Sequence, residues 1–490
     1  MKKTAFVIIL VLKLAYAFSQ KNNINWFFGD SALITFTDAG IVATKVPGYA
    51  YEASVSYSDS EGNLLFYSDG SKIYDTSKTI MSNSYLDIDQ YISGSGSSIC
   101  QGSIVIPKPA SDHEYYIINK VEEGLKYSKL DMLLNGGLGD IVIDAKNIWI
   151  FDAGAEGKYV SQKMTATKHG NGKDWWVLFH GRSASFSGDS INTFYKLLVT
   201  DEGIAGPYEQ EIGLKIENIY VGQMVFSPDG SKLAYTGNYS LEVFDFDRCT
   251  GELIEYKKVD TINGPSFSPY GCAFSSDSKK IYVSEIYNFG NDKIYQYDLS
   301  SEDDLSETKT LIYKCQVDNY GIGQMLLGSD NRIYFTIIYY NLPSAEYTLW
   351  NMNLSVINNP NEAGLACDVD TATVWLGGAR SITGLPNMPN YNLGALAGSP
   401  CDTITALQEA ENKNSIDVYP NPAKNYFYIT TNLTETVYYT LQNSLGQTIS
   451  EGSFSQNTML PAQNLTCGIY FLQVKNVEGQ CIKTEKIVKH

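Results

Sequence analysis

The sequence predicts an all-β protein: a β-propeller of about seven four-stranded blades followed by a small C-terminal β-sandwich. Tyr (36), Gly (41) and Phe (20) are abundant among the 490 residues and charged residues make up only 18%, which favours many short strands and turns. A strand–turn–strand pattern also recurs at residues 226–235, 274–282 and 327–334, with turn aspartates 48 and 53 residues apart. Short strands repeated at a period of about 50 residues are typical of propellers.

The turn of the first repeat has a chemical cause. Pro228 presets its own φ, the Asp229 side chain can accept hydrogen bonds from the backbone that follows, and Gly230 tolerates φ > 0. The later repeats keep the aspartate between two apolar runs, as Asp277 and Asp330. The sequence therefore predicts that Asp229, Gly230, Asp277 and Asp330 form the repeat turns.

The remaining blades are expected on both sides of these repeats. Residues 55–70 predict a hairpin, and residues 102–130 and 164–199 each contain three β-prone runs. A final partial blade is predicted to begin at Val374 and to be completed by an N-terminal strand within residues 26–45. That pairing would close the ring and remove two free sheet edges. Six or eight blades, or a β-sandwich joined to a second β-domain, are the alternatives.

The N-terminus predicts a signal peptide at residues 1–19, so the propeller is expected to span residues 20–397. Two lysines precede a short apolar stretch, and residues 17–19 fit the small-x-small pattern of a cleavage site, with cleavage after Ala17 as the alternative. No run approaches the roughly 18–20 apolar residues that a bilayer span requires. The sequence thus predicts export without a transmembrane span.

The acidic net charge of the chain limits the kinds of partner that it can bind. A formal net charge of −18 argues against nucleic acid, because phosphate binding requires clustered Lys and Arg. Acidic turns at 59–63 and 368–370 could supply ligands to Ca²⁺, although neither completes an EF-hand-like series. No other cofactor is expected. The eight cysteines contain no C-x-x-C pair, so nothing predicts a zinc site.

The end of the chain predicts a polar linker at residues 398–414 and a small β-sandwich at residues 415–490. Short β-prone runs in the last segment are separated by turn residues, which is typical of a sandwich. Its distinctive residues are Tyr419, Pro420, Asn421 and Pro422 after the first run, Gly446 in a hairpin turn, Gly468 and Tyr470 in a late strand, and Lys486 in a basic tail.

In their order and position these residues resemble the C-terminal sorting domain of type IX secretion in Bacteroidetes. The resemblance implies that the domain carries its cargo across the outer membrane after signal-peptide export and is then removed. It also implies that the type IX secretion machinery is a partner. The mature protein is accordingly expected to be secreted or held on the outer-membrane surface.

The repeats at 226–235 and 274–282 resemble TolB-like propeller blades and, more loosely, Trp-Asp-repeat blades. Residues 25–29 and 61–70 resemble secreted Bacteroidetes propellers that end in sorting domains. These resemblances imply a fold and a location, but they imply no reaction.

Motifs for catalysis are missing from the sequence. It contains no H-E-x-x-H, no G-x-S-x-G elbow and no P-loop, so no catalytic or metal-binding residue is assigned. His169 and His180 could meet within one blade, but histidines bonded to backbone are the commoner case. Carboxylates at strand ends could form a hydrolytic pair, although each is more readily explained as a turn residue. These carboxylates are Asp69, Asp131, Asp245, Asp298 and Asp368.

Aromatic pairs are the better lead to function. Trp175 and Trp176, Tyr339 and Tyr340, and residues 287–289 could form a platform for sugars or peptides, and the two tryptophans could instead be blade core. The primary hypothesis is a secreted or surface-displayed propeller that binds an unidentified glycan or protein. A propeller hydrolase of glycans or peptides and a surface adhesin or structural component are the alternatives, so the enzyme question stays open with binding favoured.

Overall fold

The computed structural model describes residues 21–489 except 90, 93–95, 184–189, 217–220, 238–239, 262–266, 288–290, 303, 318, 340–345, 403–415, 432, 434, 444–445, 478 and 480. The predicted signal peptide and most of the predicted linker lie outside the described residues. The chain divides into two compact units, one ending at Leu396 and the other beginning at Ala397. Each unit is described by itself.

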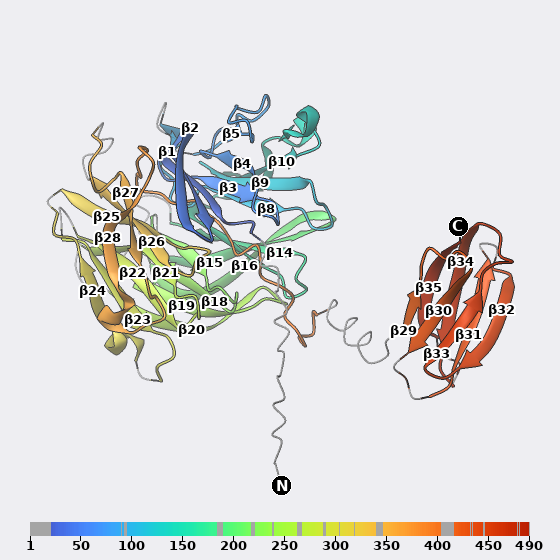
Figure 1. Ribbon diagram of the computed structural model, residues 1–490. Helices are drawn as coiled ribbons and strands as arrows, with labels where there is room; N and C mark the ends of the chain where they lie inside the picture. Colours follow the sequence, from blue (N-terminus) through green and yellow to red (C-terminus); the bar gives the residue numbers. More distant parts are fainter. Residues whose placement is uncertain are drawn as a thin grey trace, which may run out of the picture. The chain divides into compact units, whose positions relative to one another are not determined.

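The first unit is a β-propeller. Its described residues form seven sheets that follow one another in chain order around the unit (Figure 1), together with the short hairpin β6 (Tyr91–Ile92) and β7 (Gly96–Ser97). The first two sheets are small. They consist of β1 (Asn25–Thr37) with β2 (Gly40–Ala50), and of β3 (Val55–Ser58), β4 (Leu64–Ser68) and β5 (Ile73–Tyr74).

The third and fourth sheets begin the run of larger blades. The third contains β8 (Ser103–Pro107), β9 (Glu114–Val121), β10 (Gly124–Asp131), β11 (Asp140–Ile141) and β12 (Ile148–Asp152), with the short helices η1 (Asn135–Gly137), η2 (Ile143–Ala145) and η3 (Gly154–Glu156) in its connections. The fourth contains β13 (Val160–Lys168), β14 (Trp175–Gly181), β15 (Ile191–Thr200) and β16 (Gly203–Ile216).

The last three sheets have four antiparallel strands each. The fifth contains β17 (Met224–Phe226), β18 (Lys232–Thr236), β19 (Ser240–Asp247) and β20 (Glu252–Thr261). The sixth contains β21 (Phe267–Phe274), β22 (Lys280–Tyr287), β23 (Lys293–Asp298) and β24 (Thr310–Lys314), with η4 (Leu305–Thr308). The seventh contains β25 (Tyr320–Leu327), β26 (Ile333–Tyr339), β27 (Asn353–Ile357) and β28 (Val369–Trp375), with η5 (Gly364–Cys367).

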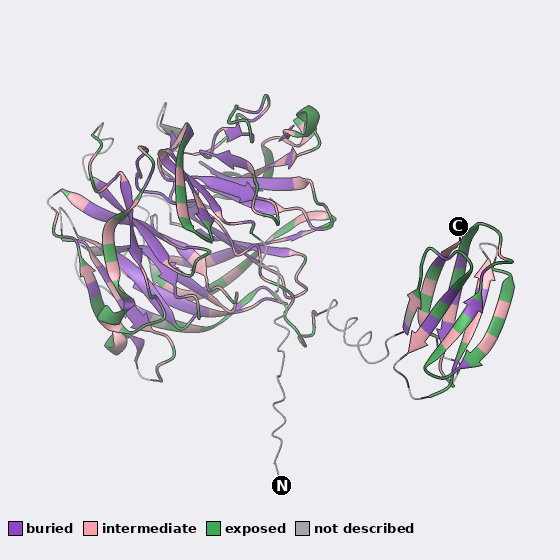
Figure 2. Ribbon diagram, viewed as in Figure 1, coloured by how far each residue is buried: buried purple, intermediate pink, exposed green. Residues whose placement is uncertain are grey.

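The first strand of each sheet lies nearest the axis. Contacts join β1 to β3 and then β3, β8, β13, β17, β21 and β25 in sequence, which makes an inner ring of strands. Stacked sheets cover one another on both faces, so side chains that alternate across a strand are all buried. All seven residues of β14 are buried, for example, and buried strands dominate this unit in Figure 2.

One turn recurs between the first and second strands of six sheets. In each, the backbone N–H of the first turn residue donates to a carbonyl at or just before the start of the next strand, as Ser227 N–H does to Lys232 O at 2.9 Å. The carbonyl of that first residue accepts in turn from a residue three positions on, as Ser227 O does from Gly230 N at 2.8 Å. The equivalent first residues are Asp59, Lys108, His169, Ser227, Ser275 and Gly328. The repeat seen in three sequence stretches therefore extends around most of the ring.

The ring closes between the N-terminal strand and the segment after β28. Asp30 on β1 donates its N–H to Arg380 O at 2.8 Å and accepts the Arg380 N–H at 3.3 Å. The Arg380 guanidinium also pairs with the Asp30 carboxylate at 3.1 Å. Gly29 is required here, because an added Cβ would lie 2.3 Å from Arg380 O. The N-terminal strand thus contacts the last part of the propeller chain, but it does not complete a C-terminal blade as predicted, because β1 pairs with β2 in a sheet of their own.

The predicted start of the final partial blade was wrong. Val374 lies in β28, which is the outer strand of the seventh sheet and pairs with β27. Residues 376–396 then form no strand and run into the axis of the propeller. The sequence predicted a strand because Val374, Trp375 and Leu376 are β-prone, but their hydrogen bonds belong to the preceding sheet.

The second unit is a small β-sandwich. One sheet contains β29 (Ile416–Tyr419), β30 (Tyr426–Thr431) and β33 (Asn457–Pro461), and the other contains β32 (Thr448–Phe454), β31 (Val437–Asn443), β34 (Gly468–Lys475) and β35 (Cys481–Lys489). Phe427 and Ile429 of the first sheet share a buried core with Leu441, Leu472 and Ile487 of the second. Burial alternates along β34, as expected for a sheet with one solvated face.

Candidate functional site

The axis of the propeller is partly filled by residues 381–396, here called the axial strap. Leu385 N donates to Gln324 Oε1 at 2.8 Å, which holds the beginning of the strap. Asn387 Nδ2 then donates to Ser103 O at 3.0 Å and to Met164 O at 2.9 Å. Tyr391 is buried and its hydroxyl donates to Val105 O at 2.9 Å. These partners place the strap along the inner strands β8 and β13.

Three glutamines, here called the glutamine cycle, bind the inner strands to one another at one end of the axis. Gln101 Nε2 donates to Met224 O at 2.9 Å, and Gln101 Oε1 accepts from Met224 N at 2.8 Å. Gln223 Oε1 accepts from Met325 N at 2.9 Å, and Gln324 Nε2 donates to Cys100 O at 2.5 Å. The cycle therefore links the third, fifth and seventh sheets and returns to the third.

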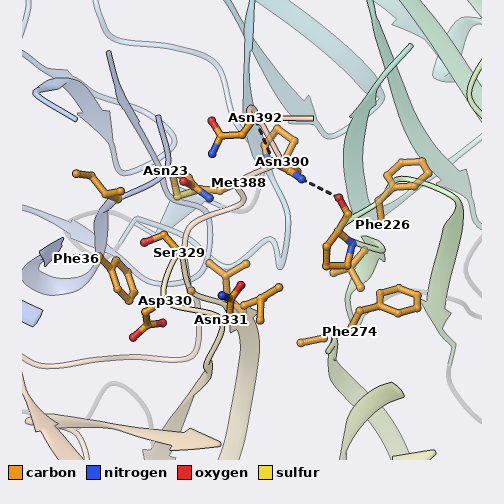
Figure 3. Close-up of a pocket in the computed structure, with 18 of the residues that line it drawn as sticks. Asn23, Phe36, Phe226, Phe274, Ser329, Asp330, Asn331, Met388, Asn390 and Asn392 are labelled. Atoms are coloured by element: carbon orange, nitrogen blue, oxygen red, sulfur yellow. Dashed lines mark hydrogen bonds between the residues drawn. The ribbon is translucent and has the colours of Figure 1, made fainter. Parts of the chain in front are cut away.

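A cavity of about 540 Å³ lies beside the axial strap. It lies between the axial strap, the N-terminal segment and the inner strands β17, β21 and β25, at the end where the repeat turns are found. Cys272 and Met325, which neighbour the glutamine cycle, also line it. Figure 3 shows Asn23, Met388 and Asn392 along one side and Phe226 and Phe274 along the other.

The cavity wall is of mixed polarity, with amides on the strap side. Phe36, Phe226 and Phe274 are among the lining residues, but Phe36 and Phe274 are buried in the cores between the sheets. Asn390 Nδ2 donates to Pro228 O at 2.8 Å, which fixes the strap against the turn of the fifth sheet (Figure 3). The Oδ1 atoms of Asn23 and Asn392 are buried, and neither has a hydrogen-bond partner among the described residues. A buried polar atom without a partner is costly, typically by about 1–3 kcal/mol.

Of the three predicted turn aspartates, Asp330 lines the cavity, whereas Asp229 and Asp277 are not among the lining residues. Asp229 Oδ1 accepts from Ser227 Oγ at 2.5 Å and from Ser231 N at 3.0 Å, and Gly230 has φ 71°. Asp277 accepts from Ser275 Oγ at 2.6 Å. Asp330 lines the cavity, and its carboxylate also bonds the Tyr334 hydroxyl and the Arg332 guanidinium, both at 2.7 Å. All three carboxylates are therefore engaged in holding their turns.

A second group of polar side chains is buried around the axis. Lys163 is fully buried, and its Nζ has no hydrogen-bond partner among the described residues and lies 4.4 Å from the centre of the Tyr235 ring. Burial lowers the pKa of Lys163 to about 7. Glu52 accepts a 2.6 Å hydrogen bond from the Tyr270 hydroxyl, and burial raises the pKa of Glu52 to about 7. Both groups therefore titrate near neutral pH.

The histidines contact backbone, and the structure does not bring them together as ligands. His169 Nε2 lies 2.9 Å from Cys249 O, and His180 Nδ1 lies 2.5 Å from Gly181 O. Burial lowers the pKa of His180 to about 3, so this ring is neutral at physiological pH. No group of three or more His, Cys, Asp or Glu within the described part of the chain is arranged to hold a metal ion.

The acidic turns considered for Ca²⁺ are occupied by protein donors. Asp59 accepts from the backbone of Glu61 and Asn63, and hydrogen bonds from these residues lower its pKa even though burial opposes the shift. Asp368 and Asp370 share the amide of Asn358 at 3.1 and 2.9 Å. These carboxylates form ordinary turn contacts.

The structure describes the two tryptophan candidates but not the tyrosine and phenylalanine candidates. Trp175 and Trp176 are both buried, and Trp176 Nε1 donates to Arg248 O at 2.9 Å, so the pair is blade core rather than an open platform. The side chains of Tyr287 and Tyr339 and residues 288–289 and 340 lie outside the described part. The cavity aromatics were not singled out from the sequence, except that Phe226 and Phe274 begin the repeat turns.

Two features of the site were missed. Gly222-Gln223-Met224 and Gly323-Gln324-Met325 repeat the same three residues two blades apart, and this pattern could have revealed the glutamine cycle. Asn23 and Asn392 carry no comparable signal, because they belong to irregular segments at opposite ends of the propeller sequence. Of the cysteines, Cys249 and Cys401 are disulfide-bonded, while Cys100 and Cys272 are free and buried.

The predicted sorting residues form a connected part of the second unit. Tyr419 ends β29, and Pro420, Asn421 and Pro422 follow it as a loop. Asn421 Nδ2 donates to Lys486 O at 2.6 Å, and Asn421 Oδ1 accepts from Val488 N at 2.9 Å. The loop is thereby fixed to β35, the last strand of the other sheet.

The remaining sorting residues lie in or beside the same sheet. Gly446 has φ 78° in the turn between β31 and β32, and Gly468 begins β34. Tyr470 is buried, and its hydroxyl donates to Thr466 O at 2.9 Å. Their individual roles in sorting stay a prediction.

A comparison with protein families identifies the second unit. Residues 417–490 match the family model "Secretion system C-terminal sorting domain". Within the described residues no helix is long and apolar enough to cross a membrane. No curated protein sequence matches the chain.

Solved propeller structures are similar at low identity. The beta-propeller domain of Cps50 (Swd1) from Myceliophteria thermophila is 11% identical with a TM-score of 0.36, over 64% of this chain and 93% of that one. The Dos1 propeller is 10% identical with a TM-score of 0.36, over 71% of this chain and 74% of that one.

A Bacteroides protein is also among the similar structures. The extracellular domain of a one component system from B. thetaiotaomicron is 12% identical with a TM-score of 0.36, over 96% of this chain and 57% of that one. The sheet topology and the inner ring of strands identify the first unit as a β-propeller. The chain is a β-propeller protein that carries a C-terminal sorting domain for export by type IX secretion to the cell surface or beyond.

Proposed function

We propose that this protein is an extracellular binding protein whose ligand occupies the axial cavity. The observation that carries the proposal is the cavity itself, about 540 Å³ in volume, with a wall of mixed polarity and two amide oxygens that have no partner among the described residues. Small-molecule sites in proteins are typically concave, with a few convergent polar groups and volumes of about 300–1,000 Å³. The sorting domain supplies the means of bringing this site to an external ligand.

The charged groups of the cavity favour binding over hydrolysis. A glycosidase of the common type requires two carboxyl groups on either side of the scissile bond. Asp38 and Asp330 are the carboxylates among the described lining residues. Asp330 is held by Arg332 and Tyr334, and Asp38 lies exposed in the turn between β1 and β2. Binding without turnover is therefore the expected behaviour.

The proposal is tested by blocking the cavity. The mature full chain is applied to arrays of bacterial and dietary glycans and of peptides, as wild type, Ser329→Trp and Ser60→Trp. Ser329 is exposed at the cavity and Ser60 is exposed at the equivalent position of another repeat turn, outside the lining, so Ser60→Trp is a matched control.

We expect wild type and Ser60→Trp to bind the same array features and Ser329→Trp to lose them. Binding that Ser329→Trp leaves intact would place the ligand elsewhere on the propeller. Release of cleaved products from the bound features would support the hydrolase instead.

A further inference from the structure

Asn23 and Asn392 are two lining residues of the cavity with an unused hydrogen-bonding atom. The side-chain oxygen of each is buried and has no hydrogen-bond partner among the described residues. Asn390 lies on the strap close to Asn392 and does have a partner, Pro228 O at 2.8 Å. The contrast indicates that Asn390 holds the strap in place, whereas the side-chain amides of Asn23 and Asn392 can still form hydrogen bonds with a ligand.

Each unpartnered amide can present either of its ends to a ligand. An asparagine amide carries an acceptor oxygen and a donor NH₂ group, and rotation about its terminal torsion exchanges them at little cost. A hydroxyl group both donates and accepts, so it satisfies the amide in either orientation. The strap side of the cavity therefore suits a ligand edge that carries hydroxyl groups.

The opposite side of the cavity is more apolar. Val225 and Pro228 line it and are partly exposed, whereas Phe36 and Phe274 are buried in the cores between the sheets. Partly exposed apolar side chains favour an apolar face on the ligand. The ligand should therefore have one polar edge and one apolar face.

The charges of the cavity select against an ionic ligand. The Asp330 carboxylate is already paired with Arg332, while Lys21 and Asp38 are exposed. A charged ligand would have to lose its hydration without gaining a free counter-charge deep in the cavity, which is unfavourable. The site thus suits a neutral molecule.

We propose that the axial cavity binds a neutral sugar ring, with its hydroxyl edge on the amides of Asn23 and Asn392 and its C–H face on Val225 and Pro228. The inference rests on the proposed function and specifies the ligand class for the same cavity. A neutral peptide is the other class of molecule that the array would reveal, and it has no need for groups that both donate and accept along one edge.

The test uses calorimetry on the mature full chain with neutral mono- and disaccharides, namely glucose, galactose, mannose, N-acetylglucosamine and cellobiose, and with the peptide Ala-Tyr-Ser-Gly, which is made uncharged by N-terminal acetylation and C-terminal amidation. Asn23→Leu and Asn392→Leu remove the amide while keeping a similar side-chain volume. Asn390→Leu serves as the comparison in which a bonded amide is lost.

We expect at least one sugar to bind and Asn23→Leu and Asn392→Leu to raise its Kd about 3- to 10-fold each, as is typical for one lost hydrogen bond. Their Tm should stay level or rise, because an unpartnered buried oxygen is removed, whereas Asn390→Leu should lower Tm. This opposite movement of affinity and Tm distinguishes ligand contacts from structural ones.

Three results would overturn the inference. If only the peptide or peptide array features bind, and Ser329→Trp abolishes that binding, the ligand class is wrong and the binding site stands. If a sugar binds but both asparagine variants leave its Kd unchanged, the amides are not its contacts. If no sugar, peptide or array feature is sensitive to Ser329→Trp, both the inference and the proposed function fail.

Discussion

Lys163 shows how a single residue can depart from the pattern of its strand. It lies on β13 with its amine fully buried, with the Tyr235 ring 4.4 Å away as a cation–π partner. Burial lowers its pKa from the usual 10.5 to about 7. Between these two values the unfolded chain binds a proton that the folded chain does not, so stability rises with pH over that range.

Replacing this lysine should therefore stabilise the propeller. Lys163→Met keeps the length of the side chain and removes a buried amine, and we expect a gain of about 1–3 kcal/mol at pH 7 that shrinks toward pH 10. Thermal unfolding of both proteins between pH 6 and 10 measures the gain. A loss of stability, or two parallel pH curves, would show that the amine has a partner in solution.

Glu52 gives the complementary prediction. Its pKa is raised from 4.5 to about 7, so the folded chain retains a proton that the unfolded chain releases between these values. Its stabilising contribution is complete below pH 4.5 and is lost as the pH rises through 7. Glu52→Gln should accordingly gain about 1–2 kcal/mol over wild type at pH 8 and nothing at pH 4.5.

The control for Glu52 is its hydrogen-bond partner. The Tyr270 hydroxyl donates to the Glu52 carboxylate at 2.6 Å and so favours the ionised form. Tyr270→Phe should lower the Tm at pH 8, where the carboxylate is ionised, more than at pH 4.5. Equal changes in Tm at both pH values in both variants would contradict the assigned titration.

The glutamine cycle is the element that joins distant blades. Gln223 Oε1 accepts from the backbone of both Cys272 and Met325, so its removal leaves two buried N–H groups without a partner. We expect Gln223→Ala to lower the free energy of unfolding by about 2–4 kcal/mol, measured by urea denaturation.

Gln210 on the outer strand β16 provides the control, because it is partly exposed and its amide also makes two backbone bonds, donating to Leu253 O and accepting from Leu253 N. Gln210→Ala should cost less than about 1 kcal/mol, since water can replace the lost bonds. Equal losses in the free energy of unfolding for the two variants would mean that the glutamine cycle stabilises the ring no more than a partly exposed pair of hydrogen bonds does.

The elements that the sequence predicted well are those with local causes. Pro228, Asp229 and Gly230 form a turn by their own chemistry, and the predicted turn is present with the same hydrogen bonds in its repeats. The small sandwich and its loop at 420–422 likewise follow from short strands separated by turn residues. Strand-level predictions succeeded wherever the deciding contacts lie within a few residues.

The axial strap could not be predicted in this way. Its position depends on Asn387, Asn390 and Tyr391 meeting backbone oxygens more than 150 residues away, and such pairings leave no periodic pattern. Val374 was assigned to a new blade for the same reason, because β-propensity does not reveal which neighbour a strand will pair with. The cavity, which is bounded by this strap, was therefore invisible from the sequence.

The whole molecule combines a ligand-binding body with a sorting domain that has its own core. A chain that ends at Asn414 retains every described strand of the propeller and loses the sorting domain. We expect it to fold, to cross the inner membrane and to accumulate in the periplasm, as seen by cell fractionation and immunoblotting. Normal appearance of the truncated chain outside the cell would contradict the assigned export route.

The most direct test of the account measures which strands of the propeller a bound ligand protects from hydrogen exchange. The mature chain is examined by mass spectrometry with and without the glycan or peptide that it binds best. We predict that protection increases in β17, β21, β25 and residues 388–392, which surround the cavity. Protection confined to the outer strands β16, β20 and β24, with no change around the cavity, would contradict it.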